Sequence, residues 1–285
     1  MKAVKSCVRI LKNIEMAEKI FLLELKAPKI AARARAGQFV HLKVGGGTAD
    51  RDPLLRRPFS FNRIDSEAGK ISIKYRVVGR GTEALSDNEP GDILDVMGPL
   101  GEGFDLSSAG DSPLIIGGGM GIAPLGPAVI DLEKKSDLTV FFGAVCASEL
   151  MEISLLKKTG VNFQLATDDG SAGIRGAVTE LLESRLEKEK KTYTSFDYVY
   201  GCGPEPMLKE LQLLSKKYGF TGEISLESRM ACGVGACLSC ARKIEQGKTG
   251  GENSGSEEES GGSWNYKNVC QEGPVFSIGE VIFDD

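Results

Sequence analysis

Four cysteines lie near the end of the chain, and their spacing suits a shared metal centre. They are Cys232, Cys237, Cys240 and Cys270. A C-x4-C-x2-C run followed by a distant fourth cysteine is the plant-type arrangement, in which four thiolates hold the two irons of a 2Fe-2S cluster. Gly233 and Gly235 are expected to let backbone N–H groups turn toward the cluster. A structural zinc site is the alternative, although such sites usually carry two C-x2-C pairs.

The remaining cysteines and the single histidine give weaker signals. Cys7 and Cys146 stand alone in the sequence, which predicts that both are buried core residues. His41 lies in a strand-like run, where a lone histidine predicts a structural role. One histidine also argues against catalytic triads and multi-histidine metal sites.

A run that begins at Arg57 could bind a diphosphate and a flat ring. An arginine at a strand end can pair with a diphosphate, and the hydroxyl of Ser60 can add a hydrogen bond. Downstream, Tyr75 can stack on a ring, and the backbone of Gly81-Thr82 can donate to phosphate oxygens. Each piece alone reads equally well as a solvated arginine or an ordinary turn, so the order of the pieces carries the prediction.

Two glycine-containing turns follow predicted strands. The loop Gly117–Gly121 precedes a helix, whose N-terminus could face a nucleotide phosphate. It departs from G-x-G-x-x-G because Ala123-Pro124 follows. The turn Tyr200–Met207 contains Cys202 and ends the last predicted parallel strand, at the edge where ligands bind. A plain turn with a buried cysteine is the alternative.

The elements that must position these residues fall into three regions. Residues 1–108 are predicted to be an antiparallel barrel or sandwich, because short alternating runs are separated by turn signals such as Gly45–Gly47. Those runs are Val4–Leu11, Ile20–Leu25, Gln38–Val44, Lys70–Val78 and Ile93–Met97.

Residues 109–222 alternate strand and helix, which predicts a parallel α/β sheet. Its strands are predicted at 113–116, 139–144, 162–167 and 198–201. Residues 223–285 form a third region with the four cysteines and an acidic, Gly/Ser-rich loop, Gln246–Ser263. The expected fold class is therefore multidomain, β plus α/β.

Composition narrows the function. The formal net charge is −5 and no long basic run occurs, which argues against a nucleic-acid partner. No apolar stretch approaches the ~20 residues of a membrane span, and the N-terminus lacks a signal-peptide pattern. The expectation is a cytoplasmic protein with no membrane partner.

Together these motifs resemble the ferredoxin-NADP reductase superfamily. The segments Glu227–Cys240 and Val269–Phe276 are more specific, and they resemble the electron-transfer subunits of type B dihydroorotate dehydrogenase. The resemblance implies an FAD-binding barrel in residues 1–108, an NAD-binding domain in 109–222 and a 2Fe-2S domain in 223–285. It covers nearly the whole chain.

The resemblance also assigns residues to cofactors. The implied FAD-binding residues are Arg57, Pro58, Phe59, Ser60, Lys74, Tyr75, Arg76, Gly81 and Thr82. The implied NAD(H)-binding residues are Gly118, Gly119 and Gly121, with Asp168 and Asp169 as weaker candidates. Cys202 would lie near the nicotinamide, as the catalytic residue, and the four cysteines would hold the cluster.

The function that the resemblance implies is a flavin iron–sulfur oxidoreductase subunit. Electrons would pass between NAD(H), FAD, the cluster and the FMN of a separate catalytic subunit, which interconverts dihydroorotate and orotate in pyrimidine biosynthesis. A heterotetramer with two of each subunit is expected. A stand-alone NADH reductase serving ferredoxin or a sulfur compound is the alternative, and a redox-sensing module without turnover is a third possibility.

The segment after the second α/β strand predicts NADH rather than NADPH. A site that binds the 2′-phosphate of NADPH normally needs an arginine or lysine there. The segment Gly143–Glu149 offers no cation, and Glu149 would repel a phosphate.

Overall fold

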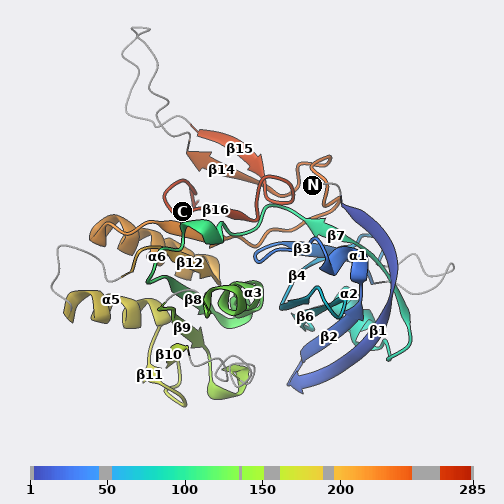
Figure 1. Cartoon of the computed structure of the whole chain (residues 1–285), viewed down its shortest axis with the longest axis horizontal. Coiled ribbons are helices and arrows are strands. Elements are labelled where there is room, and N and C mark those ends of the chain that lie inside the picture. Colours follow the sequence, from blue (N-terminus) through green and yellow to red (C-terminus); the bar gives the residue numbers. More distant parts are fainter. Residues whose placement is uncertain are drawn as a thin grey trace, which may run out of the picture.

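The computed structural model describes residues 3–44, 53–134, 137–150, 161–188, 196–245 and 264–283. Two large sheets lie side by side, and a small hairpin projects from one edge of the molecule (Figure 1). Two features of the sequence prediction, the turn Gly45–Gly47 and the loop Gln246–Ser263, fall outside the described residues.

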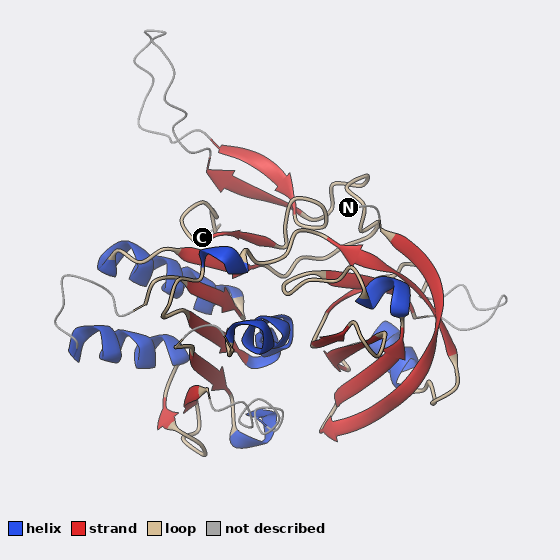
Figure 2. Ribbon diagram, in the orientation of Figure 1, coloured by secondary structure: helices blue, strands red, loops and turns tan. Residues whose placement is uncertain are grey.

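The N-terminal sheet is antiparallel and curls around its own core (Figure 2). Its strand order is β4-β3-β7-β1-β2-β6-β5. The strands are β1 (Val4–Ala17), β2 (Ile20–Lys26), β3 (Phe39–Lys43), β4 (Arg57–Ser60), β5 (Arg63–Asp65), β6 (Lys70–Arg76) and β7 (Ile93–Leu100). Two short helices, α1 (Pro28–Ala31) and α2 (Arg80–Ser86), flank it. The predicted antiparallel β-region is confirmed, although β4, β5, α1 and α2 were not predicted.

The second sheet has the order β11-β10-β9-β8-β12-β13-β16, and only β16 runs antiparallel to its neighbour. Its strands are β8 (Leu114–Gly118), β9 (Thr139–Ala144), β10 (Asn162–Thr167), β11 (Ile174–Arg175), β12 (Val199–Cys202), β13 (Gly222–Ser225) and β16 (Val275–Ser277). Strands β8, β9 and β12 are buried throughout, as continuous apolar runs in a parallel sheet require. The predicted parallel α/β sheet is confirmed.

Helices cover both faces of this sheet (Figure 1). They are α3 (Ile122–Leu132), α5 (Val178–Lys188) and α6 (Glu205–Tyr218), with 3-10 turns η1 (Leu106–Ser108), η2 (Gly119–Gly121) and η3 (Ala147–Leu150). Because side chains alternate along a strand, Ile115 packs with α3 while Leu114 and Ile116 pack with α5 and α6. Helix α6 ends at Tyr218, and Gly219 follows with a φ of 76°, which suits a left-handed cap.

The C-terminal region does not stand apart from the parallel sheet. Strand β16 pairs with β13, so residues after the cysteine motif form the sheet's edge. The other strands of this region, β14 (Ala241–Glu245) and β15 (Trp264–Asn268), pair with each other as an antiparallel hairpin. The domain boundaries 1–108, 109–222 and 223–285 stay a prediction.

The prediction of buried core positions for Cys7 and Cys146 was wrong. Cys7 is exposed, because Val8 and Ile10 point into the barrel and the alternation of β1 turns Cys7 outward. Cys146 is half-buried in the turn after β9, where its Sγ lies 3.0 Å from Ser148 Oγ. Among the described residues, no helix is long and apolar enough to cross a membrane.

Candidate functional site

The loop Cys232–Cys240, called the cluster loop below, lies between β13 and β14. Backbone N–H groups within it point at sulfur. Those of Val234 and Ala236 donate to Cys232 Sγ at 3.4 and 3.3 Å, and that of Gly235 donates to Cys270 Sγ at 3.1 Å. Gly233 and Gly235 have φ values of 71° and 76°, which is the left-handed geometry that such a turn needs.

The Cys237 thiol lies near that of Cys232, and the Cys270 thiol lies near those of Cys240 and Cys232. A hydrogen bond from Ser239 lowers the pKa of the Cys237 thiol to about 6, whereas burial raises that of Cys270 to about 12. All seven cysteines are free.

No three cysteine, histidine or carboxylate side chains converge on one metal position in the described part of the chain. Neighbouring thiols with inward N–H donors instead fit a centre that spreads four thiolates over two irons.

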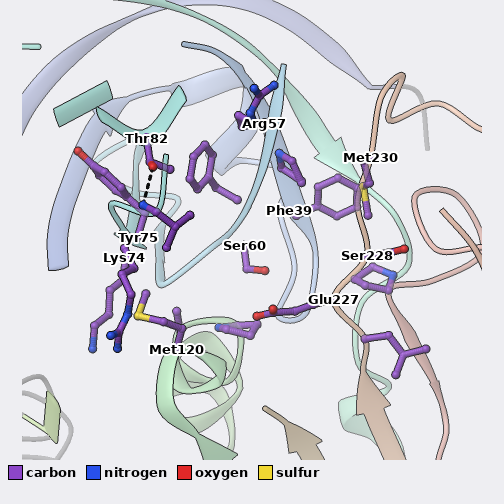
Figure 3. A pocket seen from close by; sticks show the side chains of 18 residues that line it. Phe39, Arg57, Ser60, Lys74, Tyr75, Thr82, Met120, Glu227, Ser228 and Met230 are labelled. Atoms are coloured by element: carbon purple, nitrogen blue, oxygen red, sulfur yellow. Dashed lines mark hydrogen bonds between the residues drawn. The ribbon is translucent and has the colours of Figure 1, made fainter. Parts of the chain in front are cut away.

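A cavity of about 420 Å³ separates the barrel from α3, and we call it the cleft pocket (Figure 3). Eight of the nine residues predicted to bind FAD line it: Arg57, Pro58, Phe59, Ser60, Lys74, Tyr75, Arg76 and Thr82. The ninth, Gly81, lies behind the wall, where a Cβ would come 2.9 Å from Arg57 Nε. The opposite wall includes Met120 of η2 and the segment Leu226–Ser228.

Tyr75 on the aromatic side of the cleft pocket is held by several contacts. Tyr75 stacks on Phe21 with ring centroids 5.4 Å apart and meets the edge of Phe59 at 5.8 Å. Its hydroxyl donates to Asn13 Oδ1 at 3.0 Å, and burial raises its pKa to about 12. Flat aromatic walls beside arginine and lysine side chains fit a molecule that joins a ring system to a diphosphate.

Thr82 has a different local task. Its Oγ1 accepts a hydrogen bond from the backbone N–H group of Val78 at 2.9 Å (Figure 3) and another from that of Gly79 at 3.2 Å. These bonds fix the start of α2, so the threonine hydroxyl shapes the cavity wall.

A second cavity of about 310 Å³, the glycine-loop pocket, lies at the carboxyl ends of β8, β9 and β10. Gly118 and Gly119 line it, and so does Asp168. Gly121 does not, because it packs against the turn after β12, where a Cβ would come 2.3 Å from the carbonyl oxygen of Cys202. Asp169 is also absent from the lining and accepts hydrogen bonds from Ser171 instead.

Cys202 lies at the end of β12, with only 1% of its surface exposed. Burial raises the pKa of its thiol, and the nearby Glu227 carboxylate adds to the effect. The thiol therefore stays protonated at neutral pH and is no nucleophile. Cys202 lines neither of the two cavities, although Pro204 of the same turn lines the glycine-loop pocket.

Glu227 is a candidate that the sequence analysis missed. It extends from the wall opposite the barrel into the cleft pocket, toward Ser60 (Figure 3). Glu227 is an exposed residue, yet the protein around its carboxylate desolvates that group enough to raise its pKa. Its sequence signal was its place at the start of the segment Glu227–Cys240, five residues before Cys232.

The two cavities share an ion pair. Arg76 lines the cleft pocket and Glu149 lines the glycine-loop pocket, and Arg76 Nη2 lies 2.7 Å from Glu149 Oε1. The carboxylate expected to repel a 2′-phosphate thus has a cation from β6 beside it. Sequence reasoning could not supply this contact, because 73 positions separate the partners.

Two family models match the chain. Residues 8–104 match an oxidoreductase FAD-binding domain, and residues 227–282 match the iron–sulfur cluster binding domain of dihydroorotate dehydrogenase B. Among solved structures, the chain resembles one described as an NADH-dependent reduced ferredoxin-NADP oxidoreductase studied for flavin-based electron bifurcation. The TM-score is 0.80 and the identity 29%, over 97% of this chain and 90% of the other.

Curated relatives agree with these models over nearly full length. The electron transfer subunit of dihydroorotate dehydrogenase B (NAD(+)) from Desulforamulus reducens is 38% identical, over 94% of this chain and 95% of the relative. The same subunit from Geobacillus sp. (strain WCH70) is also 38% identical, with 96% of each chain covered. The chain therefore belongs to the family of electron transfer subunits of dihydroorotate dehydrogenase B.

Proposed function

We propose that the chain moves electrons from NADH in the glycine-loop pocket, through FAD in the cleft pocket, to a 2Fe-2S cluster in the cluster loop. One observation carries the proposal. The wall of the cleft pocket includes Leu226, Glu227 and Met230, and this segment runs directly into Cys232. A molecule in the cleft pocket thus lies against the segment that leads into the cluster loop.

Flavin supplies the chemistry that this route needs, because it takes two electrons as a hydride and releases them singly. Arg57 and Lys74 are proposed to neutralise the diphosphate, since guanidinium and ammonium groups pair with phosphate oxygens. Tyr75 and Phe59 are proposed to hold the flat part of the cofactor in place. Pro58, Ser60 and Arg76 complete that wall, and Gly81 and Thr82 shape its end.

On the NADH side, Gly118 and Gly119 are proposed to let the coenzyme approach the backbone closely. Gly121 keeps the start of α3 against the Cys202 turn, so the two nucleotide-facing turns stay in one place. Glu227 is proposed to order the reacting end of the nicotinamide, and Cys202 to hold the neighbouring turn in place from beneath. A neutral buried thiol does this by packing rather than by proton transfer.

The four cysteines are proposed to be the cluster ligands, with one thiol pair for each iron. Cys232 and Cys237 form the first pair, and Cys240 and Cys270 the second. Backbone N–H groups aimed at Cys232 and Cys270 stabilise the negative charge of bound thiolates.

As a family member, the chain works with a catalytic dihydroorotate dehydrogenase subunit. We propose that this partner carries FMN and that two copies of each chain assemble. The exposed side chains of Val234 and Leu238 in the cluster loop support a contact there, since 50% and 63% of their surfaces are open. A cytoplasmic location stays a prediction, which the free cysteines support.

Anaerobic purification tests the proposal. The protein should carry FAD and two irons per chain, the bound flavin should bleach with NADH, and NAD should be reduced when dihydroorotate and the catalytic subunit are added. Zinc in place of iron, or a chain that never binds flavin, would contradict it. Rapid bleaching also excludes a sensor without turnover.

The likeness to the bifurcating oxidoreductase favours one second candidate, an NADH-dependent ferredoxin reductase. The discriminating experiment offers reduced holoprotein two acceptors, ferredoxin and the dihydroorotate dehydrogenase catalytic subunit. The first proposal expects fast reoxidation by the catalytic subunit, whereas the second expects it by ferredoxin alone.

A further inference from the structure

His41 lies on the face of β3 that points away from the barrel core. Val40 and Leu42 enter that core, whereas Phe39 packs in a different hydrophobic core, which also contains Cys240 and Cys270. Side chains alternate along a strand, so His41 shares the face of Phe39. The single histidine of the chain therefore faces the C-terminal region rather than the interior of the barrel.

The imidazole of His41 touches the cluster loop. A Cβ on Gly233 would lie 2.6 Å from His41 Nδ1 and 2.8 Å from Cε1, so only glycine fits against the ring. Gly233 directly follows Cys232. His41 also meets Phe39 edge to face with centroids 6.2 Å apart, and Phe39 lines the cleft pocket. The ring thus contacts both the cluster loop and a residue of the cleft-pocket wall.

Both ring nitrogens of His41 lack a hydrogen-bond partner among the described residues, although none of the residue's surface is exposed. A buried polar group without a partner is unfavourable, so such a group calls for an explanation. Imidazole carries at least one N–H donor in every protonation state. Thiolate and sulfide atoms of a bound cluster accept hydrogen bonds, and the cluster loop touches the ring.

We propose that His41 donates a hydrogen bond to a sulfur atom of the bound cluster and thereby raises the cluster's reduction potential. The inference rests on the proposed electron-transfer function. A donor to a cluster sulfur favours the reduced state, because it stabilises the added negative charge, and such hydrogen bonds are among the factors that set cluster potentials. Cysteine spacing alone would not have pointed to a residue almost 200 positions upstream.

Two variants separate hydrogen bonding from packing. His41→Phe keeps a flat ring and removes the donor, and His41→Gln keeps an N–H donor without the ring. The potentials of the cluster and of FAD are measured in the holoprotein by redox titration, with paramagnetic resonance for the cluster and absorbance for the flavin. We expect His41→Phe to lower the equilibrium constant for cluster reduction about tenfold, or about 59 mV for one electron. His41→Gln should recover most of this shift, and the FAD potential should not change.

Leu42→Val is the matched control, because Leu42 neighbours His41 but points into the barrel core; it should leave both potentials unchanged. Equal cluster potentials in His41→Phe and His41→Gln would overturn the proposal, and so would loss of the cluster in both variants, since packing would then explain the residue. A shift confined to FAD would overturn it as well. Failure of the proposed function is recognised separately, because the unaltered protein would then lack iron or flavin.

Discussion

The cluster loop and the cleft pocket are built in opposite ways. Three of the four proposed cluster ligands lie within nine consecutive positions, and the glycines between them impose the turn. The cleft pocket instead draws its walls from β4, β6, η2 and the segment before Cys232. The chemistry of a local motif can thus be recognised from the sequence, whereas a cavity assembled from distant segments can be recognised only in the folded structure. The two should consequently respond differently to substitution.

The largest effect should come from removing a buried cluster ligand. Cys240→Ala deletes a buried thiol that is one of the four proposed ligands, so iron content should fall to background while FAD stays bound. Iron analysis and flavin release measure the two losses separately. Cys146→Ala is the control, since Cys146 is free and lies outside the cluster loop. Retention of iron in Cys240→Ala would refute this ligand assignment.

A substitution in the cleft pocket should have the opposite effect, with loss of FAD and retention of iron. Arg57→Ala removes a charge-assisted contact of about 1.5–3 kcal/mol, so FAD should bind roughly 10- to 100-fold more weakly, with iron retained. Fluorescence titration of flavin-depleted protein measures the affinity. Arg63→Ala, an exposed arginine on β5, should bind FAD normally. An unchanged affinity in Arg57→Ala would place the diphosphate elsewhere.

Glu227 joins the two regions and should give a smaller, pH-dependent effect. Its pKa is raised in the folded protein, so its contribution to stability is present below the unfolded pKa and is lost as pH rises through the folded value. Glu227→Gln cannot ionise. The melting temperature of this variant should therefore rise relative to that of the unaltered protein as pH increases toward neutrality. Melting curves across pH test this, with the exposed Glu67→Gln as control. A melting temperature of Glu227→Gln that instead falls relative to the unaltered protein as pH rises would contradict a raised pKa for Glu227.

The smallest effect on stability is expected at the ion pair between the two pockets. Partly exposed pairs contribute about 0–1 kcal/mol, so Glu149→Gln should lower the melting temperature only slightly. Its effect on coenzyme choice should be larger. Loss of the carboxylate removes a negative charge that would repel a 2′-phosphate and leaves the Arg76 cation unpaired beside the glycine-loop pocket. The ratio of kcat/KM for NADPH to that for NADH should rise. An unchanged ratio would remove Glu149 from coenzyme selection.

The sequence predicted those parts of the fold whose signals are local. The buried runs at Thr139–Ala144 and Asn162–Thr167 match β9 and β10, because a continuous apolar run has few alternative uses in a parallel sheet. It missed β4, since Arg57–Ser60 has no alternation and contains a proline. It also misplaced Cys7, whose burial depends on which face of β1 turns inward.

The candidate site divides along the same line. The glycine turns around Cys232 could be predicted, because positive φ is a property of the residues themselves. The places of Glu227 and His41 could not, since each depends on chain segments that meet only in the folded molecule. The Arg76–Glu149 pair escaped prediction for the same reason.

One measurement tests the central claim most directly. Holoprotein without its partner is mixed anaerobically with NADH, and flavin absorbance and the paramagnetic signal of a reduced cluster are followed together. We expect the flavin to bleach first and the cluster signal then to appear in the unaltered protein, while Cys240→Ala shows only the bleaching. Flavin bleaching with a cluster that stays oxidised in the unaltered protein would contradict the route from the cleft pocket to the cluster loop.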